Sequence, residues 1–246
     1  LTNLWDRIGY GWAIRVLALI ALCTGSIGVL LLRSRLPPAQ NATAKPDFRI
    51  FRQIPFLLAT IGIFLLEFSL FIPLAYISTY AIHKGFKVDF SYQLLPIMNA
   101  GSVTGRILTG YYADVVGAFN VCIFAVLICL VSCLCVWLPL GHTTAGIVVF
   151  AVLFGFGSGT AIAIAPVCIG KMCKTQHYGR YYATSYTVVS IACLIGIPIA
   201  GAIVRSDGGE YDSVIIFTGV IFFASAVAMM WGKLWQLGWG AWFAVF

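Results

Sequence analysis

Charged residues are scarce in this sequence. They make up 9% of the 246 residues, whereas soluble domains carry about 25%. Hydrophobic residues account for 61% of the chain. A chain with so little polar surface is not covered by water on all sides, so the composition excludes a soluble domain and predicts an integral membrane protein.

Patterned metal ligands and catalytic groups are also lacking. The eight cysteines lie mostly inside apolar runs, without a paired CxxC motif, which excludes a disulfide framework and a zinc site. We interpret them as small apolar residues within helices. His83, His142 and His177 are scattered over connections, and no catalytic set includes them. We therefore expect no enzyme activity, no metal and no cofactor.

The net charge of +7 does not form a nucleic-acid-binding pattern. A basic binding face would spread along one surface, whereas these residues gather in two connections. This distribution fits the positive-inside rule of membrane proteins. We expect the lipid bilayer as a partner and no nucleic acid.

Strand-like alternation is absent, and several apolar runs are long enough to cross a bilayer as α-helices. The predicted fold class is all-α, a polytopic membrane helix bundle with about seven transmembrane helices. Pro73 is expected to bend the longest run. The seven runs cover residues 12–32, 54–80, 92–113, 119–138, 144–168, 183–204 and 213–233.

The basic residues of the connections predict the orientation. One side of the membrane collects nine of them: Arg33, Arg35, Lys45, Arg49, Arg52, Lys171, Lys174, Arg180 and Lys233. The other side collects four: Arg7, Lys84, Lys87 and Arg205. The positive-inside rule puts the larger group in the cytoplasm. On this topology the sequon at Asn41 is cytoplasmic and stays unmodified.

Composition also divides the chain into expected domains. Residues 1–33 form one helix, 34–53 a polar, Pro-containing linker, 54–233 a six-helix bundle and 234–246 an aromatic tail. The first residue is Leu rather than Met, so we expect the N-terminus to be incomplete. For the Trp-rich tail two interpretations stand: a segment lying in the membrane interface, or an aberrant C-terminus.

The segment 92–113 carries the most unusual polar residues of the chain. At 100° per residue, Asn99, Ser102, Arg106 and Thr109 share one helix face. Arginine within a membrane costs about 2.5–3.5 kcal/mol on insertion scales, so it marks a functional site by default. We expect Arg106 to face a water-filled cavity; the alternative is that it snorkels to the interface or forms a structural ion pair. Gly101 and Gly105 form a small-xxx-small pair for close helix packing.

Glu67 is the one acidic residue well inside a predicted span. It is suited to pairing with Arg106 or to proton coupling, because burial in an apolar site favours proton uptake. A neutral carboxyl hydrogen-bonded at a helix contact is an equally weighted alternative.

Two further segments combine polar residues with glycine or proline. Residues 183–204 begin polar, with Tyr186 and Ser190 as candidate solute-binding groups, and end with a bendable or closely packed stretch. In "GFGSG", residues 155–159, close helix packing is favoured over nucleotide binding, because no strand precedes it. The expected packing or hinge residues here are Gly155, Gly159, Gly196, Pro198 and Gly201.

The stretch "GYYADVVG" resembles the signature of the major facilitator superfamily, with Gly110, Asp114 and Gly117 at the matching positions. Together with "LLPIMNAGSVTGRILTGYYADVVGAFNV" and "FGFGSGTAIAIAPV", the chain is similar to the fungal monocarboxylate-transporter-like family, which includes riboflavin carriers and metabolite exporters. The resemblance implies helix 6 and helices 7–12 of a twelve-helix carrier. Helices 1–5 of the same carrier would then be its missing partner.

The resemblance also implies a function. A secondary carrier of a small organic solute, possibly with a proton, would work by alternating access, most readily in the plasma membrane. An exporter of a fungal secondary metabolite, or a non-transporting half-carrier or sensor, is the alternative. The chain departs from the signature, because Val115, Val116 and Ala118 stand where basic residues are usual. Ser102 stands where animal monocarboxylate transporters have an acid.

Overall fold

A computed structural model describes residues 2–32 and 45–237. The chain divides into two compact units, Leu1–Asn41 and Ala42–Phe246. Within the described ranges all regular structure is helical. The long helices are α1 (Thr2–Leu31), α2 (Ile54–His83), α3 (Val88–Val116), α4 (Ala118–Val131), α6 (Thr144–Lys171), α7 (Tyr178–Ser206) and α8 (Asp212–Leu237).

The first unit contains α1, which is interrupted at Gly9. The backbone there has φ 75° and ψ 160°, a left-handed conformation that glycine adopts without a Cβ penalty. From Gly9 to Leu31 the helix is apolar, with a mean hydropathy of 2.2. Most of its large apolar side chains are exposed. A helix apolar on all sides is suited to a lipid environment.

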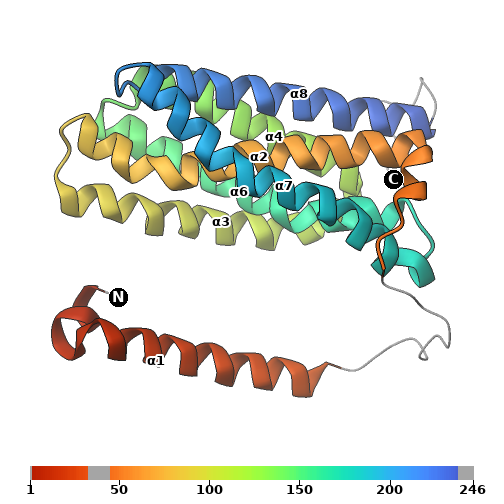
Figure 1. Ribbon diagram of the computed structural model, residues 1–246, viewed down its shortest axis with the longest axis horizontal. Helices are drawn as coiled ribbons and strands as arrows, with labels where there is room; N and C mark the ends of the chain where they lie inside the picture. Colours follow the sequence, from red (N-terminus) through yellow and green to blue (C-terminus); the bar gives the residue numbers. More distant parts are fainter. Residues whose placement is uncertain (1, 33–44, 238–246) are drawn as a thin grey trace. The chain divides into compact units, whose positions relative to one another are not determined.

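The second unit is a bundle in which successive long helices run in alternating directions (Figure 1). The most extensive contacts join α3 to α6 and α2 to α8. The core contains fully buried aromatic rings, among them Phe56, Phe150, Phe154 and Trp137. Trp137 stacks on Phe150 with ring centroids 4.6 Å apart.

Among the described residues, six helices are long and apolar enough to cross a membrane. The predicted run 92–113 corresponds to α3, which is as long as its neighbours, with 29 residues. It is missing from the six because Asn99, Arg106 and the flanking glycines and hydroxyls lower its mean hydropathy. The predicted number of about seven spans therefore corresponds, among the described residues, to six apolar helices and the more polar α3.

The predicted run 119–138 is not a uniform α-helix. After α4 the chain forms a π-helical turn at Ser132–Trp137 (η2) and a short helix at Leu138–Leu140 (α5). The N–H of Leu138 donates to the carbonyl of Cys133, five residues back, which defines the wider turn. Apolar periodicity does not reveal such a turn, because the side chains on both sides remain apolar.

The end of the predicted linker is a structured contact. Residues Phe48–Arg52 form a 3₁₀-helix (η1), and Asp47 accepts a hydrogen bond from the N–H of Arg49 at its start. The Asp47 carboxylate lies 3.0 Å from the Arg180 guanidinium at the start of α7. The Asp47 N–H also donates to Thr184 Oγ1 at 2.9 Å. The segment before α2 is thus held against α7; residues 33–44, with Asn41, lie outside the described ranges.

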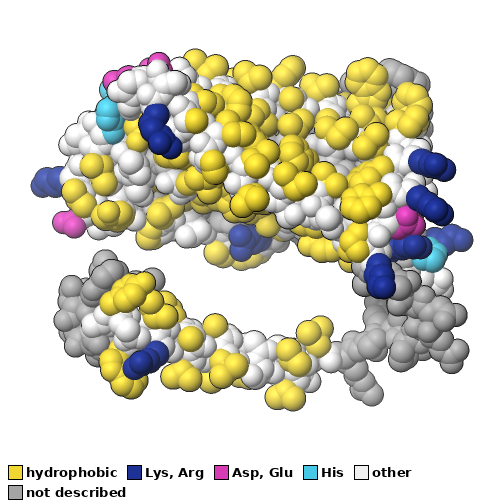
Figure 2. Space-filling model, viewed as in Figure 1, with side chains coloured by type: hydrophobic (Ala, Val, Ile, Leu, Met, Phe, Trp, Pro, Cys, Tyr) yellow, Lys and Arg dark blue, Asp and Glu magenta, His cyan; other side chains and the backbone are white. Residues whose placement is uncertain are grey.

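Basic side chains gather at the end of the bundle where α2 and α7 begin and α6 ends (Figure 2). The described members of the predicted cytoplasmic group at this end include Arg49, Arg52, Lys171, Lys174 and Arg180. The opposite end, between α7 and α8, carries Glu210, which bonds Lys84 at 3.0 Å. Among the described residues of this unit, the two predicted charge groups therefore lie toward opposite ends of the bundle; Arg33 and Arg35 lie outside the described ranges, and Arg7 belongs to the first unit.

Candidate functional site

The structure separates the four polar residues of α3 that were predicted to share one face. Asn99 and Arg106 are exposed, whereas Ser102 and Thr109 are buried. The Thr109 hydroxyl donates to the carbonyl of Gly105 at 2.6 Å. The four residues therefore do not form one exposed polar surface, because the part of the face with Ser102 and Thr109 is buried against α6.

Arg106 lies on the exposed side of α3, together with Asn99 and Asp114. We call this the free side of α3, because the other side packs on α6. Within the described ranges no ion pair or hydrogen bond is formed by its guanidinium. The alternative of a structural ion pair is thus not formed in this bundle. An unneutralised guanidinium on a membrane helix can attract an anionic group where water or a ligand reaches it.

Glu67 is buried in α2, with only 6% of its surface exposed. It faces α7, where Tyr186 and Cys193 lie close enough to interact with it electrostatically. No ion pair joins it to Arg106 among the described residues. The structure therefore does not bring the two charged candidates together.

The two candidates of α7 differ in exposure. Tyr186 is half-buried, and its ring stacks on that of Tyr182 with centroids 4.3 Å apart. Ser190 is exposed, and its hydroxyl donates to the carbonyl of Thr187 at 2.9 Å. Tyr186 therefore belongs with Glu67 at the α2–α7 contact, while Ser190 lies on the free side of α7.

The four glycines of α3 and α6 lie where these helices touch. A Cβ added at Gly101 would stand 2.6 Å from the carbonyl oxygen of Val152, and one at Gly105 would meet the backbone of Phe156. From the other side, Cβ atoms at Gly155 and Gly159 would meet the backbone of α3. Only hydrogen at these positions allows the two backbones to approach so closely.

The glycines of α7 lie against α2. A Cβ at Gly196 would stand 2.8 Å from the carbonyl oxygen of Phe68, and one at Gly201 would stand 2.7 Å from the hydroxyl of Tyr76. That hydroxyl donates to the carbonyl of Ile197 at 3.2 Å, next to Pro198. The α2–α7 contact is therefore close at two levels, with a cross-helix hydrogen bond beside the proline.

The signature segment forms the turn between α3 and α4. Gly110 is exposed, with open space where a Cβ would be, and Asp114 is exposed one turn later. Gly117 has φ +95° and ends α3, its N–H bonding the carbonyl of Ala113 at 3.1 Å. A left-handed residue is needed here because one helix ends and the next begins at once.

A buried lysine supports this turn, and the sequence interpretation missed it. Lys233 of α8 is 1% exposed, and its ammonium donates to Asn120 Oδ1 at 2.5 Å. The Asn120 amide donates in turn to the carbonyl of Val116, the last residue of α3, at 2.8 Å. The one signal available in the sequence was this lysine at the end of the predicted apolar run 213–233.

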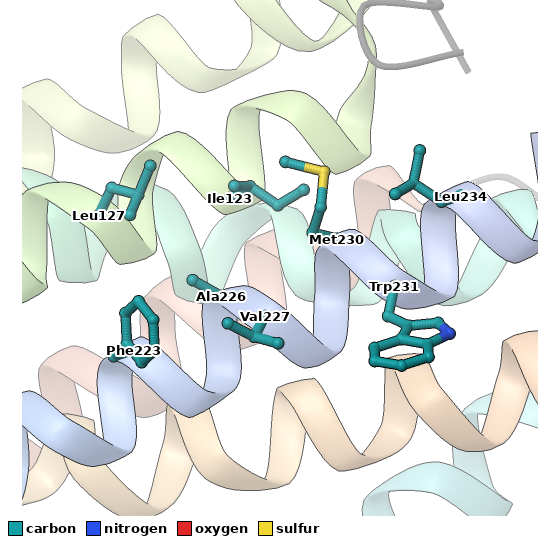
Figure 3. A pocket seen from close by; sticks show the side chains of 8 residues that line it. All are labelled: Ile123, Leu127, Phe223, Ala226, Val227, Met230, Trp231 and Leu234. Carbon is teal, nitrogen blue, oxygen red and sulfur yellow. The ribbon is translucent and has the colours of Figure 1, made fainter. Parts of the chain in front are cut away.

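An apolar groove of about 310 Å³ lies between α4 and α8 (Figure 3). Its lining, which includes Leu127, Phe223 and Trp231, has no polar side-chain contribution apart from the indole. Such a surface offers no group to orient a solute, and suits lipid chains. Trp231, at the end of the predicted bundle, and Trp235, in the predicted aromatic tail, are half-exposed on α8. Trp239 and Trp242 of the tail lie outside the described residues.

Metal ligands do not gather in the described part of the chain. No group of three or more His, Cys, Asp or Glu side chains comes together there. The cysteines within it are free thiols.

The long apolar helices and the polar residues between them define a polytopic α-helical membrane protein. Residues 3–193 and 123–236 match the family described as Major Facilitator Superfamily. The chain therefore belongs to the major facilitator superfamily, whose fold the bundle represents in part.

Fungal relatives cover nearly the whole chain. An MFS-type transporter of Gibberella moniliformis is 37% identical over 94% of this chain and 56% of its own length. The riboflavin transporter MCH5 of Saccharomyces cerevisiae is 31% identical, over 94% and 47%. The aspyridones efflux protein apdF of Emericella nidulans is 33% identical, over 94% and 45%. The chain spans about half the length of these relatives.

Proposed function

We propose that this chain forms the C-terminal half of a secondary carrier that moves a small organic solute across a membrane by alternating access. The observation that carries the proposal is the free side of α3, where Asn99 and Arg106 are exposed on a membrane helix whose other side packs on α6. In the complete carrier this side faces the solute path, with helices 1–5 as the opposite wall. The expected location is the plasma membrane.

Each candidate group has a proposed role. Arg106 attracts an anionic part of the solute, while Asn99 and Ser190 offer hydrogen bonds from α3 and α7. Glu67 takes up a proton during the cycle, next to Tyr186. Gly117 and Asp114 act at the cytoplasmic turn during gating. In this proposal the six-helix bundle is preceded by helix 6 (residues 1–33) and the linker (residues 34–53), and it is followed by the aromatic tail (residues 234–246).

The direction of transport has two candidates. Similarity to a riboflavin transporter supports uptake of a riboflavin-like or monocarboxylate-like solute. Similarity of the same order to an efflux protein supports export of a fungal metabolite. Outside this class, a non-transporting half-carrier or sensor is the alternative function.

The test is transport by the complete carrier, with uptake and efflux measured separately for anionic and neutral solutes. Arg106→Ala is expected to lower transport of the anionic solute at least tenfold, since one charge-assisted contact contributes about 1.5–3 kcal/mol. Arg205→Ala, in the last turn of α7, is the matched control. It removes an arginine away from α3 and is expected to leave transport unchanged. Equal rates for Arg106→Ala and Arg205→Ala with every anionic solute would remove the proposed role of Arg106.

A further inference from the structure

The inward side of the short helix η1 (Phe48–Arg52) is fixed to the bundle. Ile50 is buried, and the ring of Phe51 stacks on that of Phe56 in α2, with ring centroids 5.4 Å apart. The ion pair and the hydrogen bond from Asp47 to α7 add to these contacts. They hold η1 in one orientation, so its other side chains are presented outward.

The outward side of η1 combines one aromatic ring with two cations. Phe48 is 59% exposed, and the side chains of Arg49 and Arg52 are exposed as well. Among the described residues, no ion pair engages either guanidinium. The acid of this segment, Asp47, is paired with Arg180 instead. Two unneutralised arginines beside an exposed ring fit an anionic group that is carried by an apolar body.

This surface lies at the level where the membrane-spanning helices begin. Gln53 alone separates η1 from α2. Gly232 of α8 lies against the first turn of α2, because a Cβ added there would stand 3.5 Å from the carbonyl oxygen of Pro55. On the same helix Trp231 and Trp235 are half-exposed, and tryptophan is enriched at the membrane–water interface. η1 is therefore at the depth of phospholipid headgroups.

Neighbouring segments extend the positive surface, and Figure 2 shows basic side chains together at this end of the bundle. Lys45 precedes η1, Lys171 ends α6 and Lys174 lies between α6 and α7; all three are exposed. With the two arginines of η1 they are five exposed cations. Clusters of about four to eight Lys or Arg next to a membrane helix are typical of segments that bind anionic lipids.

We propose that η1 is a docking surface for anionic phospholipids. Arg49 and Arg52 bind the phosphate-containing headgroup, and the ring of Phe48 enters the membrane interface beside the acyl chains. Phe48 favours a lipid over a free anion, because a free anion would gain nothing from an exposed ring. The surface is separate from Arg106, which lies on α3, and it does not depend on the proposed transport function.

The test is photolabelling of the full chain in phosphatidylcholine nanodiscs. A small fraction of the lipid is phosphatidylserine or phosphatidylcholine with a photoreactive diazirine in its acyl chain, and labelled peptides are identified by mass spectrometry. Relative to the lipid-exposed helix α4, phosphatidylserine is expected to label the peptides of residues 45–57 roughly tenfold more than phosphatidylcholine does. Equal labelling of these peptides by the two lipids would overturn the proposal.

Variants of matched charge test the arginines. A cation near the membrane surface contributes about fivefold to binding an anionic lipid, so Arg49→Ala with Arg52→Ala is expected to remove the preference for phosphatidylserine. The same pair changed to lysine keeps most of it. Lys87→Ala with Arg205→Ala removes two exposed cations near the opposite end and is expected to leave it unchanged. An equal loss in the two alanine pairs would show that only net charge matters and would overturn the site.

The aromatic contact has its own control. Phe48→Ser is expected to lower labelling by phosphatidylserine about threefold, because the ring is only partly removed from water at the interface. Tyr92→Ser removes a ring from α3 with the same exposed fraction of 59% and is expected to have no effect on residues 45–57. Unchanged labelling of Phe48→Ser would mean that the arginines bind a headgroup without the ring, which contradicts the proposed docking of η1 in the interface.

Discussion

The close contact between α3 and α6 is expected to tolerate no added methyl group at Gly105. A Cβ there would stand 2.9 Å from Thr160 Oγ1 and closer still to the carbonyl oxygen of Phe156. The second neighbour is backbone, so relief requires α6 to move. Gly110 of the same helix is the matched control, because nothing lies within 4 Å of its Cβ position.

The magnitude follows from comparing the two alanine variants. Replacing glycine by alanine within a helix favours folding by roughly 0.5–1 kcal/mol at either position. At Gly105 overpacking opposes this gain by about 1–3 kcal/mol. Gly105→Ala is therefore expected to be less stable than Gly110→Ala by about 1–3 kcal/mol.

The assay is unfolding in mixed detergent micelles with increasing sodium dodecyl sulfate, followed by circular dichroism. A thiol-reactive dye provides a second measurement, because Cys122, Cys129, Cys133 and Cys168 are fully buried and react only after unfolding. Equal midpoints for the Gly105 and Gly110 variants would refute the argument that the helix backbones meet at Gly105.

Two other contacts lead to predictions. The Lys84 ammonium, by its hydrogen bond and charge, and then His83, lower the pKa of Glu210 below its usual value. The contact therefore stabilises the fold above about pH 4.5, and this is lost as the pH falls through the lowered pKa. Glu210→Gln is expected to lower the melting temperature by a few degrees at most at pH 7, and a difference that persists at pH 3 would contradict this. At the other end, Lys233→Met is expected to cost about 1–3 kcal/mol, because Asn120 loses a donor. A double-mutant cycle with Asn120→Ala checks this, and additive effects would contradict it.

The sequence predicted the helices well because membrane spans have a strong length signal. Apolar runs identified each long helix, but the boundaries were short of the structure. The run 92–113 became Val88–Val116, because helices continue past the hydrocarbon core into polar surroundings. The π-helical turn at Ser132–Trp137 had no signal, since it changes hydrogen bonding without changing side-chain polarity.

The candidate site was less predictable, because a helical projection does not say which arc faces a neighbour. Ser102 and Arg106 are adjacent on the projection, but the first is buried against α6 and the second is exposed. A helical projection also cannot predict contacts between segments that are distant in the sequence. Asn120 and Lys233 are separated by 113 residues, and neither residue alone indicates the other.

The signature turn has valines after Asp114, where the resemblance leads one to expect basic residues. Val115 and Val116 are both exposed at the end of α3 and, being apolar, supply no charge to the turn. The support of the turn comes instead from Lys233, through Asn120 to the carbonyl of Val116. A cation near the C-terminal end of α3 also interacts favourably with the helix dipole. A cation therefore does lie beside the signature turn, but α8 supplies it instead of the signature positions.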